Sequence, residues 1–274
     1  MSDAAPSNLG PSSNTTFDAR NAEAYEQTMG RWSRRLAPLL IRYGGLADGD
    51  RVLDVGCGTG SLAVTLPDIA NVAGVAGIDQ AEVYIRHARG RTTDPRFHFQ
   101  QADACALPFG DASFDRAFSL LVLQFIPKAV GAVAEMRRVV RPGGTVTAAV
   151  WDSYGGMSHI RMLWDIAAVL DPALERPLFR SLSAPGELAD AWRAAGLVDV
   201  EQTSLLIRME FSCFDDYWLP ITAEGPVAQF TRTLSGSARA TLEDHVRRAY
   251  CANRPEGPRS FASVAWACRG TVPR

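Results

Sequence analysis

The chain has 274 residues, a formal net charge of −2 and 47% apolar residues. This length allows one large domain with a sizeable core. The near-neutral charge gives no global positive field of the kind that attracts nucleic acids or anionic lipids. The most apolar stretch, 118–126, is far shorter than the roughly 20 residues of a membrane-spanning helix. We therefore expect neither a nucleic-acid partner nor a membrane partner.

The five cysteines are odd in number, widely spread and without a Cys-x-x-Cys pair. They predict neither a disulfide framework nor a metal site, and they favour a cytoplasmic protein with reduced thiols. Residues 1–16 are rich in Ser, Asn, Ala and Pro and lack the apolar core of a secretory signal. We expect a disordered tail there. Lys128 is the only lysine, a bias that is associated with GC-rich bacterial genomes.

Residues 21–43 carry apolar side chains near helical spacing, which predicts one or two helices that Gly44 and Gly45 end. After them, short apolar runs alternate with helical patterns. Strands are predicted at 51–55, 72–78, 97–101, 114–120 and 145–151, and helices at 61–69, 81–89 and 128–140. This alternation favours a parallel, doubly wound sheet.

Beyond residue 151 the pattern changes. It predicts helices at 157–170 and 186–195, a long strand at 198–211, a last strand at 261–268 and, between these strands, a helical insertion at 212–259. Aromatic side chains in and beside the insertion are expected either to form an apolar cover over a substrate or to pack in the core. The candidates for substrate binding in these regions are Trp151, Tyr217 and Trp218.

A glycine-rich turn, Gly56-Cys57-Gly58-Thr59-Gly60, directly follows the first predicted strand and opens a helix. Backbone N–H groups and the helix dipole can meet a ligand there, provided that no Cβ blocks its approach. The dinucleotide fingerprint requires its third glycine at the position of Ser61. The turn therefore tells against a pyrophosphate site.

Acidic residues follow the next two predicted strands. Asp79 comes 19 positions after Gly60 (79 − 60), where a carboxylate can accept hydrogen bonds from ribose hydroxyls. Asp103 follows the third strand at the same edge of the sheet, where it can accept a hydrogen bond from an adenine amino group. Three successive strand ends thus predict one nucleoside site.

Five motifs occur in a fixed order: V-L-D-V-G-C-G-T-G at 52–60, G-I-D-Q at 77–80, A-D-A at 102–104, F-D-R-A-F-S at 114–119 and R-P-G-G at 141–144. Together they resemble class I S-adenosylmethionine-dependent methyltransferases, in particular the branch of ubiquinone and menaquinone C-methyltransferases. The resemblance covers residues 25–151. It implies a Rossmann-like, doubly wound, mostly parallel sheet of seven strands with an antiparallel last strand and a helical lid.

The resemblance also implies the cofactor S-adenosylmethionine, with S-adenosylhomocysteine as product. Asp54 and the glycine-rich turn would surround the methionine part, Asp79 would hold the ribose, and Asp103 would bind the adenine edge. Tyr25 and Arg31 would meet the methionine carboxylate. The implied cofactor-binding residues are Tyr25, Arg31, Asp54, Gly56, Cys57, Gly58, Thr59, Gly60, Asp79, Gln80, Asp103, Ala104, Ser119, Leu120 and Leu121.

The expected organisation is a single methyltransferase domain at 17–274. It comprises N-terminal lid helices at 17–45, a cofactor-binding core at 51–151 and the insertion at 212–259 as a substrate lid. Gln124, a further substrate-binding candidate, departs from the histidine that is often found after this strand in the quinone branch. This departure weakens any transfer of the quinone substrate. The oligomeric state is left open, a homodimer included.

Methyl transfer to a small molecule is the function that these motifs favour. In-line displacement at a sulfonium needs positioning more than a metal or a covalent nucleophile. The candidates for a general base are His159, His245, Asp152, Asp215 and Asp216. The alternatives are a decarboxylase or cyclase that binds the same cofactor, a nicotinamide oxidoreductase, which Ser61 disfavours, and a binding module without catalysis.

Overall fold

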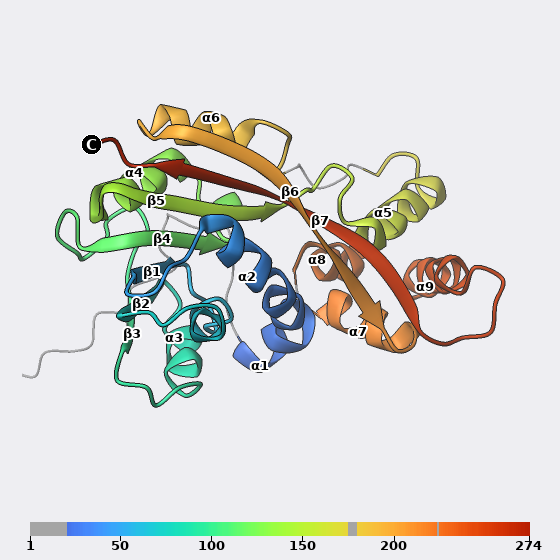
Figure 1. Ribbon diagram of the computed structural model, residues 1–274. Helices are drawn as coiled ribbons and strands as arrows, with labels where there is room; N and C mark the ends of the chain where they lie inside the picture. Colours follow the sequence, from blue (N-terminus) through green and yellow to red (C-terminus); the bar gives the residue numbers. More distant parts are fainter. Residues whose placement is uncertain (1–20, 175–179, 224) are drawn as a thin grey trace, which may run out of the picture.

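The computed structural model describes residues 21–174, 180–223 and 225–274. Its centre is a seven-stranded sheet with the order β3-β2-β1-β4-β5-β7-β6 (Figure 1), in which β7 is antiparallel to both neighbours. The expected Rossmann-like sheet with an antiparallel last strand is confirmed. The tail expected at 1–16 lies outside the described residues.

Most strands lie where the apolar runs predict them. The strands are β1 Arg51–Val55, β2 Gly74–Asp79, β3 Phe97–Gln101, β4 Phe114–Leu120, β5 Val140–Trp151, β6 Val198–Phe211 and β7 Arg259–Thr271. The helices and helical turns are α1 Ala22–Tyr25, η1 Glu26–Gly30, α2 Arg31–Gly44, η2 Ala63–Asp68, α3 Glu82–Arg89, η3 Leu123–Phe125, α4 Ala129–Val139, α5 Ser158–Leu170, α6 Glu187–Ala194, α7 Phe214–Ala223, α8 Gly225–Thr233 and α9 Gly236–Cys251.

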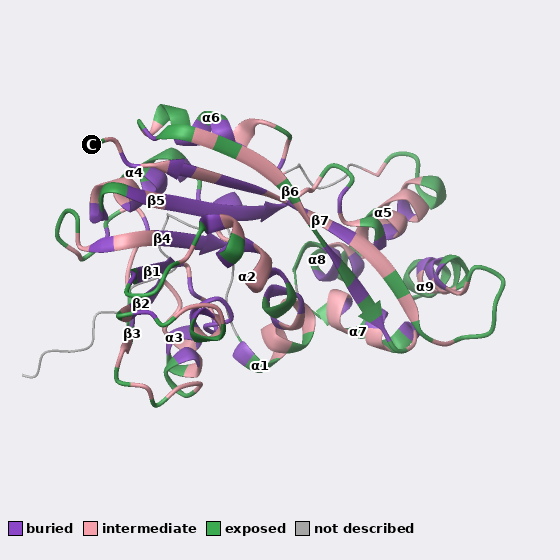
Figure 2. Ribbon diagram, viewed as in Figure 1, coloured by how far each residue is buried: buried purple, intermediate pink, exposed green. Residues whose placement is uncertain are grey.

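The sheet separates two hydrophobic cores. In β1, Val52 belongs to the core beneath α2 and α3, whereas Leu53 belongs to the core beneath α4 and α6. Both side chains are fully buried, as expected for a parallel strand that is covered on both faces. The exposed face of β6 contrasts with the buried lengths of β4 and β5 (Figure 2). Strands β1 and β4, which carry two of the cofactor motifs, are therefore central in the sheet, whereas β3, which precedes Asp103, is an edge strand.

Two predicted elements differ most from the structure, one in type and one in its starting residue. The helix expected at 61–69 is a 3₁₀ turn, η2, because Pro67 lacks an N–H group and Val64 and Thr65 are β-branched. Strand β5 begins at Val140, five residues before the predicted start. Its Pro-Gly-Gly segment pairs with the chain end, where the N–H group of Val272 donates to the Gly144 carbonyl oxygen at 2.9 Å.

Helices α7, α8 and α9, called the lid below, come between β6 and β7 in the chain and pack beside these two strands, which extend beyond the others (Figure 1). Stacked aromatic side chains fill this region. The ring centroids of Phe214 and Trp218 lie 5.7 Å apart, and those of Tyr217 and Tyr250 lie 5.6 Å apart. Side-chain packing therefore holds the lid on the sheet.

None of the helices in the described residues is long and apolar enough to cross a membrane. The same part of the chain places no cluster of His, Cys, Asp or Glu side chains where it would hold a metal ion.

Candidate functional site

A cavity of about 1170 Å³ opens at the carboxyl ends of β1, β2, β4 and β5. This edge of a parallel sheet is the usual ligand-binding edge of doubly wound folds. The N-terminal helices close one side of the cavity, and residues of α5, α7 and α8 close another. The lid and the motif-bearing strands therefore enclose one common space.

The glycine-rich turn forms the wall at the end of β1. Gly56 has φ +71°, and a Cβ there would lie 2.5 Å from the Val122 side chain. Gly58 has φ +53°, and nothing lies within 4 Å of the position of its Cβ. Gly56 thus allows close packing of the protein, whereas Gly58 leaves room for a ligand.

Asp79, at the end of β2, is fixed on the cavity wall by backbone groups. Its Oδ2 accepts the N–H of Gly58 at 3.0 Å, and its Oδ1 accepts the N–H of Ala81 at 2.9 Å. Each oxygen keeps a lone pair for a ligand donor. Burial raises the pKa of Asp79, so a hydrogen-bonding ligand would stabilise its ionised form.

Asp54, at the end of β1, is buried with one oxygen free of a partner. Its Oδ2 accepts the N–H of Ala63 at 3.2 Å, whereas Oδ1 has no hydrogen-bond partner among the described residues. Burial raises the pKa of Asp54 to about 7. A buried acceptor without a partner costs free energy, and a ligand donor would remove that cost.

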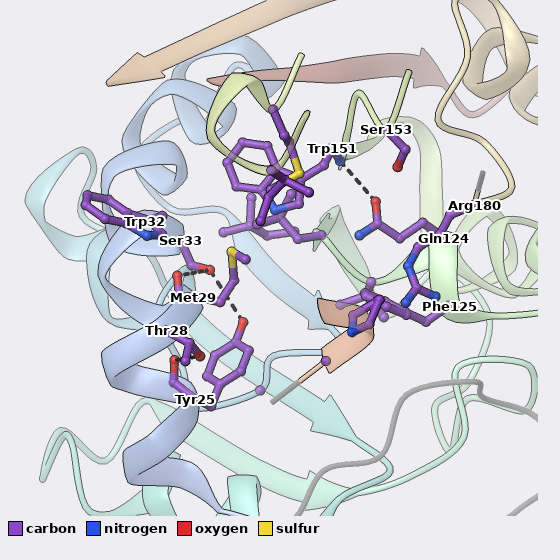
Figure 3. Close-up of a pocket in the computed structure, with 18 of the residues that line it drawn as sticks. Tyr25, Thr28, Met29, Trp32, Ser33, Gln124, Phe125, Trp151, Ser153 and Arg180 are labelled. Atoms are coloured by element: carbon purple, nitrogen blue, oxygen red, sulfur yellow. Dashed lines mark hydrogen bonds between the residues drawn. The ribbon is translucent and has the colours of Figure 1, made fainter. Parts of the chain in front are cut away.

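One face of the N-terminal helical segment lines the cavity opposite these strands (Figure 3). The Tyr25 hydroxyl lies 3.4 Å from Ser33 Oγ, and the Tyr25 ring lies 5.2 Å from the Tyr84 ring. Burial raises the pKa of Tyr25 to about 12, so the phenol is neutral at physiological pH. Tyr25 is therefore a neutral hydrogen-bonding group on the wall.

Arg31 also reaches the cavity, but its guanidinium is paired with the lid. One amino group donates to Asp216 Oδ1 at 2.7 Å and the other to the Asp216 carbonyl oxygen at 3.1 Å. The guanidinium also lies 4.4 Å from the Trp32 ring centroid. The contact expected with a cofactor carboxylate is thus replaced in the structure by an ion pair between α2 and α7.

Only some of the remaining cofactor-binding candidates line the cavity. Cys57, Thr59, Gln80, Ala104, Leu120 and Leu121 line the cavity, whereas Gly60, Asp103 and Ser119 do not. Asp103 Oδ1 accepts the N–H of Cys105 at 2.8 Å in a turn, and Ser119 is fully buried within the sheet. Asp103 is therefore not part of this wall, and its expected contact with adenine stays a prediction.

The acceptor-side candidates are divided in the same way. Gln124 and Trp151 line the cavity, and Gln124 Oε1 accepts the backbone N–H of Trp151 at 3.0 Å. Tyr217 and Trp218 lie in the lid core instead, where the Tyr217 hydroxyl donates to the His159 carbonyl oxygen at 2.9 Å. Their size and burial suit core packing, so the expectation that they line the substrate pocket does not match their position.

Of the two histidine candidates, only His159 reaches the cavity. It is 3% exposed, its Nδ1 has no partner among the described residues, and burial lowers its pKa to about 3. His245 is exposed on α9, with Nδ1 2.9 Å from the Thr241 carbonyl oxygen. The carboxylates of Asp152, Asp215 and Asp216 do not line the cavity either.

Several wall residues were not anticipated. Thr28, Met29, Trp32 and Ser33 share a helix face with Tyr25, and this helical spacing was a signal that could have found them. No comparable pattern marks the acceptor side. Its further wall residues include Phe125, Ser153, Met157, Ile160, Trp164, Arg180 and Val227, beside Phe230, which is one of the insertion aromatics expected to cover a substrate.

Comparison with known proteins agrees with this geometry. Residues 53–148 match the family described as methyltransferase domain. The 27-O-demethylrifamycin SV methyltransferase of Amycolatopsis mediterranei is 38% identical over 132 residues, which are 47% of this chain and 46% of that protein. The malonyl-[acyl-carrier protein] O-methyltransferase of Pseudescherichia vulneris is 32% identical over 174 residues, 64% of this chain and 66% of that protein. The chain spans about half to two thirds of the length of such relatives.

Solved structures share the fold at low sequence identity. The YcgJ protein of Bacillus subtilis has a TM-score of 0.58 and 19% identity, and the match covers 88% of this chain and 99% of that chain. The [4+2]-cyclase SpnF has a TM-score of 0.54 and 21% identity, with 95% and 86% covered. Residues 53–148 thus match a methyltransferase domain, and the whole sheet has the fold of these solved structures.

Proposed function

We propose that this protein is an S-adenosylmethionine-dependent methyltransferase that acts on a small molecule. The observation that carries the proposal is the wall formed by the ends of β1 and β2. The unpartnered Oδ1 of Asp54 and the backbone-fixed carboxylate of Asp79 line the same cavity as the open space at Gly58. These groups fit the amino group, the ribose hydroxyls and the close approach of a nucleoside cofactor.

The bound cofactor would supply a methyl group on a sulfonium centre. Asp79 would hold the ribose, Asp54 would accept a hydrogen bond from the amino group, and Leu120 and Leu121 would pack against the cofactor. Leu121 has φ +64°, an uncommon conformation for leucine, and its N–H donates to the Ala149 carbonyl oxygen at 2.7 Å. The chain would therefore act by fixing two reactants in line and excluding water.

The cavity supports a small acceptor, and so does the relative that is named for 27-O-demethylrifamycin SV. The acceptor side lies beneath α5, α7 and α8, and the two relatives described above are named as methyltransferases, one of them as an O-methyltransferase. Gln124 stands where the quinone branch often has histidine, and its side-chain oxygen is bonded to Trp151. We therefore propose an acceptor other than a quinone.

His159 is the candidate base on this side. Because burial lowers its pKa to about 3, the imidazole is neutral at physiological pH and can accept a proton only transiently. Its partnerless Nδ1 would then orient an acceptor hydroxyl.

The main alternative is a cofactor-binding enzyme of another reaction class, since the cyclase SpnF shares the fold. The test is incubation with methyl-labelled S-adenosylmethionine and a panel of phenols, carboxylates and amines. A labelled product together with S-adenosylhomocysteine is expected. Products that form without the label would favour the alternative reaction class.

A further inference from the structure

Charge is unevenly distributed along the cavity wall. Among the residues that the structure describes, the only carboxylates on this wall are Asp54 and Asp79, at the ends of β1 and β2. The wall beyond β4 and β5 carries no carboxylate in the described ranges. It carries three arginines instead, namely Arg161, Arg180 and Arg232. The cationic side chains on the acceptor side are therefore not matched by any carboxylate among the described residues of that part of the wall.

Arg180 differs from the other two arginines, because it is not exposed and no described carboxylate is paired with it. Arg161 is exposed and paired with Asp165 at 2.8 Å, and Arg232 is exposed and donates to the Ala223 carbonyl oxygen at 2.8 Å. Arg180 is half-buried, and none of the carboxylates in 21–174, 180–223 or 225–274 forms an ion pair with it. Burial lowers the pKa of Arg180, which is the sign of a cation without a compensating charge.

The position of Arg180 is defined by its stacking on the aromatic ring next to Gln124. Its guanidinium carbon lies 4.2 Å from the Phe125 ring centroid. Figure 3 shows Arg180, Phe125 and Gln124 together on the side of the cavity opposite Tyr25 and Met29. Stacking fixes the guanidinium plane and leaves its edge donors available to a ligand.

Most other side chains of the acceptor side are apolar, beside a few neutral polar ones such as Gln124, Ser153 and His159. Its wall includes Met157, Ile160, Trp164, Leu174, Ile221, Val227 and Phe230. A buried cation in such surroundings gains most from a single anionic group, because the planar fork of arginine matches a carboxylate with two hydrogen bonds. A phosphate or diphosphate would call for more than one such cation.

We propose that Arg180 binds a carboxylate on an otherwise apolar or aromatic methyl acceptor. This inference rests on the proposed function, because it takes the other end of the cavity as the cofactor site. Arg180 is thereby a specificity-determining residue for the acceptor.

The test is equilibrium binding to protein saturated with S-adenosylhomocysteine. The probes are matched pairs, naphthalene-2-carboxylate against naphthalene-2-carboxamide and 4-phenylbutyrate against 4-phenylbutyramide, followed by calorimetry. We expect each carboxylate to bind about tenfold more tightly than its amide. Arg180→Gln should abolish that preference, Arg180→Lys should keep part of it, and the control Arg193→Gln on α6, outside the cavity wall, should leave it unchanged.

A second arm separates the acceptor site from the cofactor site. S-Adenosylhomocysteine and 5′-methylthioadenosine, which lacks the carboxylate and the amino group, are titrated into wild type and Arg180→Gln. Unchanged affinity for both is expected. A loss confined to S-adenosylhomocysteine would assign Arg180 to the cofactor carboxylate and overturn the inference.

A protein that binds S-adenosylhomocysteine could still bind the carboxylates no better than their amides, or not at all. That result would also overturn the inference, and it would leave the proposed function standing. Failure of S-adenosylhomocysteine itself to bind would instead remove the proposed function and the inference with it.

Discussion

The two sides of the cavity are built by different means. At the ends of β1 and β2, backbone conformation and backbone N–H groups shape the wall, as the turn at Gly56 and the anchored Asp79 show. On the lid side, packed side chains hold the wall in place. Trp218 is buried in the lid core, and Arg31 forms an ion pair with Asp216. Substitutions on the cofactor side should therefore change ligand affinity, whereas substitutions in the lid core should change stability.

The largest effect is expected in the lid core. Trp218 is 2% exposed and stacks on Phe214, so Trp218→Ala should lower the free energy of unfolding by about 3–5 kcal/mol. Urea unfolding measures this loss, with Leu219→Ala, an exposed neighbour on α7, as the control. A Trp218→Ala protein of normal stability with impaired acceptor binding would instead make Trp218 a pocket residue.

Asp54 should make the stability of the ligand-free protein depend on pH. Its pKa is about 7 in the folded chain and near 3.8 when unfolded, so the folded state holds the extra proton between these values. The free energy of unfolding should therefore fall as pH rises from about 4 to 7, by up to about 4 kcal/mol from this group. Burial lowers the pKa of His159 from 6.5 to about 3. The contribution of His159 to the free energy of unfolding therefore rises with pH over this range, opposite to that of Asp54.

The variant Asp54→Asn separates the contribution of Asp54 to the pH dependence of stability from that of His159. The variant should gain about 4 kcal/mol relative to wild type at pH 8 but only about 1.5 kcal/mol at pH 5, as measured by urea unfolding at both values. An equal difference at pH 5 and pH 8 would mean that Asp54 does not titrate between them.

Two glycines in one turn should respond differently. Gly56→Ala places a Cβ 2.5 Å from Val122 at positive φ, and should destabilise the protein by about 2–4 kcal/mol. Gly58→Ala meets open space, so its cost should be only about 1 kcal/mol. Its Cβ would occupy room left for the ligand, so the affinity for S-adenosylhomocysteine should fall. The reverse pattern in unfolding and calorimetry would exchange the roles assigned to these glycines.

The smallest expected effect concerns Arg31. Arg31→Gln removes a partly exposed ion pair to the lid and should cost about 1–2 kcal/mol of stability. A double-mutant cycle with Asp216→Asn measures the coupling. S-Adenosylhomocysteine affinity should change less than about threefold. A large loss of affinity would restore Arg31 as a ligand of the cofactor carboxylate.

Local sequence signals predicted the cofactor side because local chemistry builds it. Strand β1 and the glycine turn follow from an apolar run and from conformations that favour glycine. Asp79 ends a strand, so its place at the sheet edge follows from topology. Asp103 also follows a strand, but its Oδ1 accepts the nearby Cys105 N–H and the residue is not part of the cavity wall, so its contact with adenine stays a prediction.

The lid side could not be predicted in the same way. An aromatic side chain such as Tyr217 suits either a pocket wall or a core, and contacts with distant residues such as Tyr250 decide between them. Arg31 pairs with a residue 185 positions away. Arg180 carries no periodicity or motif, so only the folded chain shows that it faces the cavity.

The central claim is that the ends of β1 and β2 bind S-adenosylmethionine. Calorimetric titration with S-adenosylmethionine, S-adenosylhomocysteine and NAD, repeated with Asp79→Ala and with the exposed control Asp190→Ala on α6, tests it directly. We expect selective binding of the S-adenosyl compounds and a loss of about 1.5–3 kcal/mol in Asp79→Ala alone. Binding of NAD, or S-adenosyl binding that is unaffected by Asp79→Ala, would contradict the account.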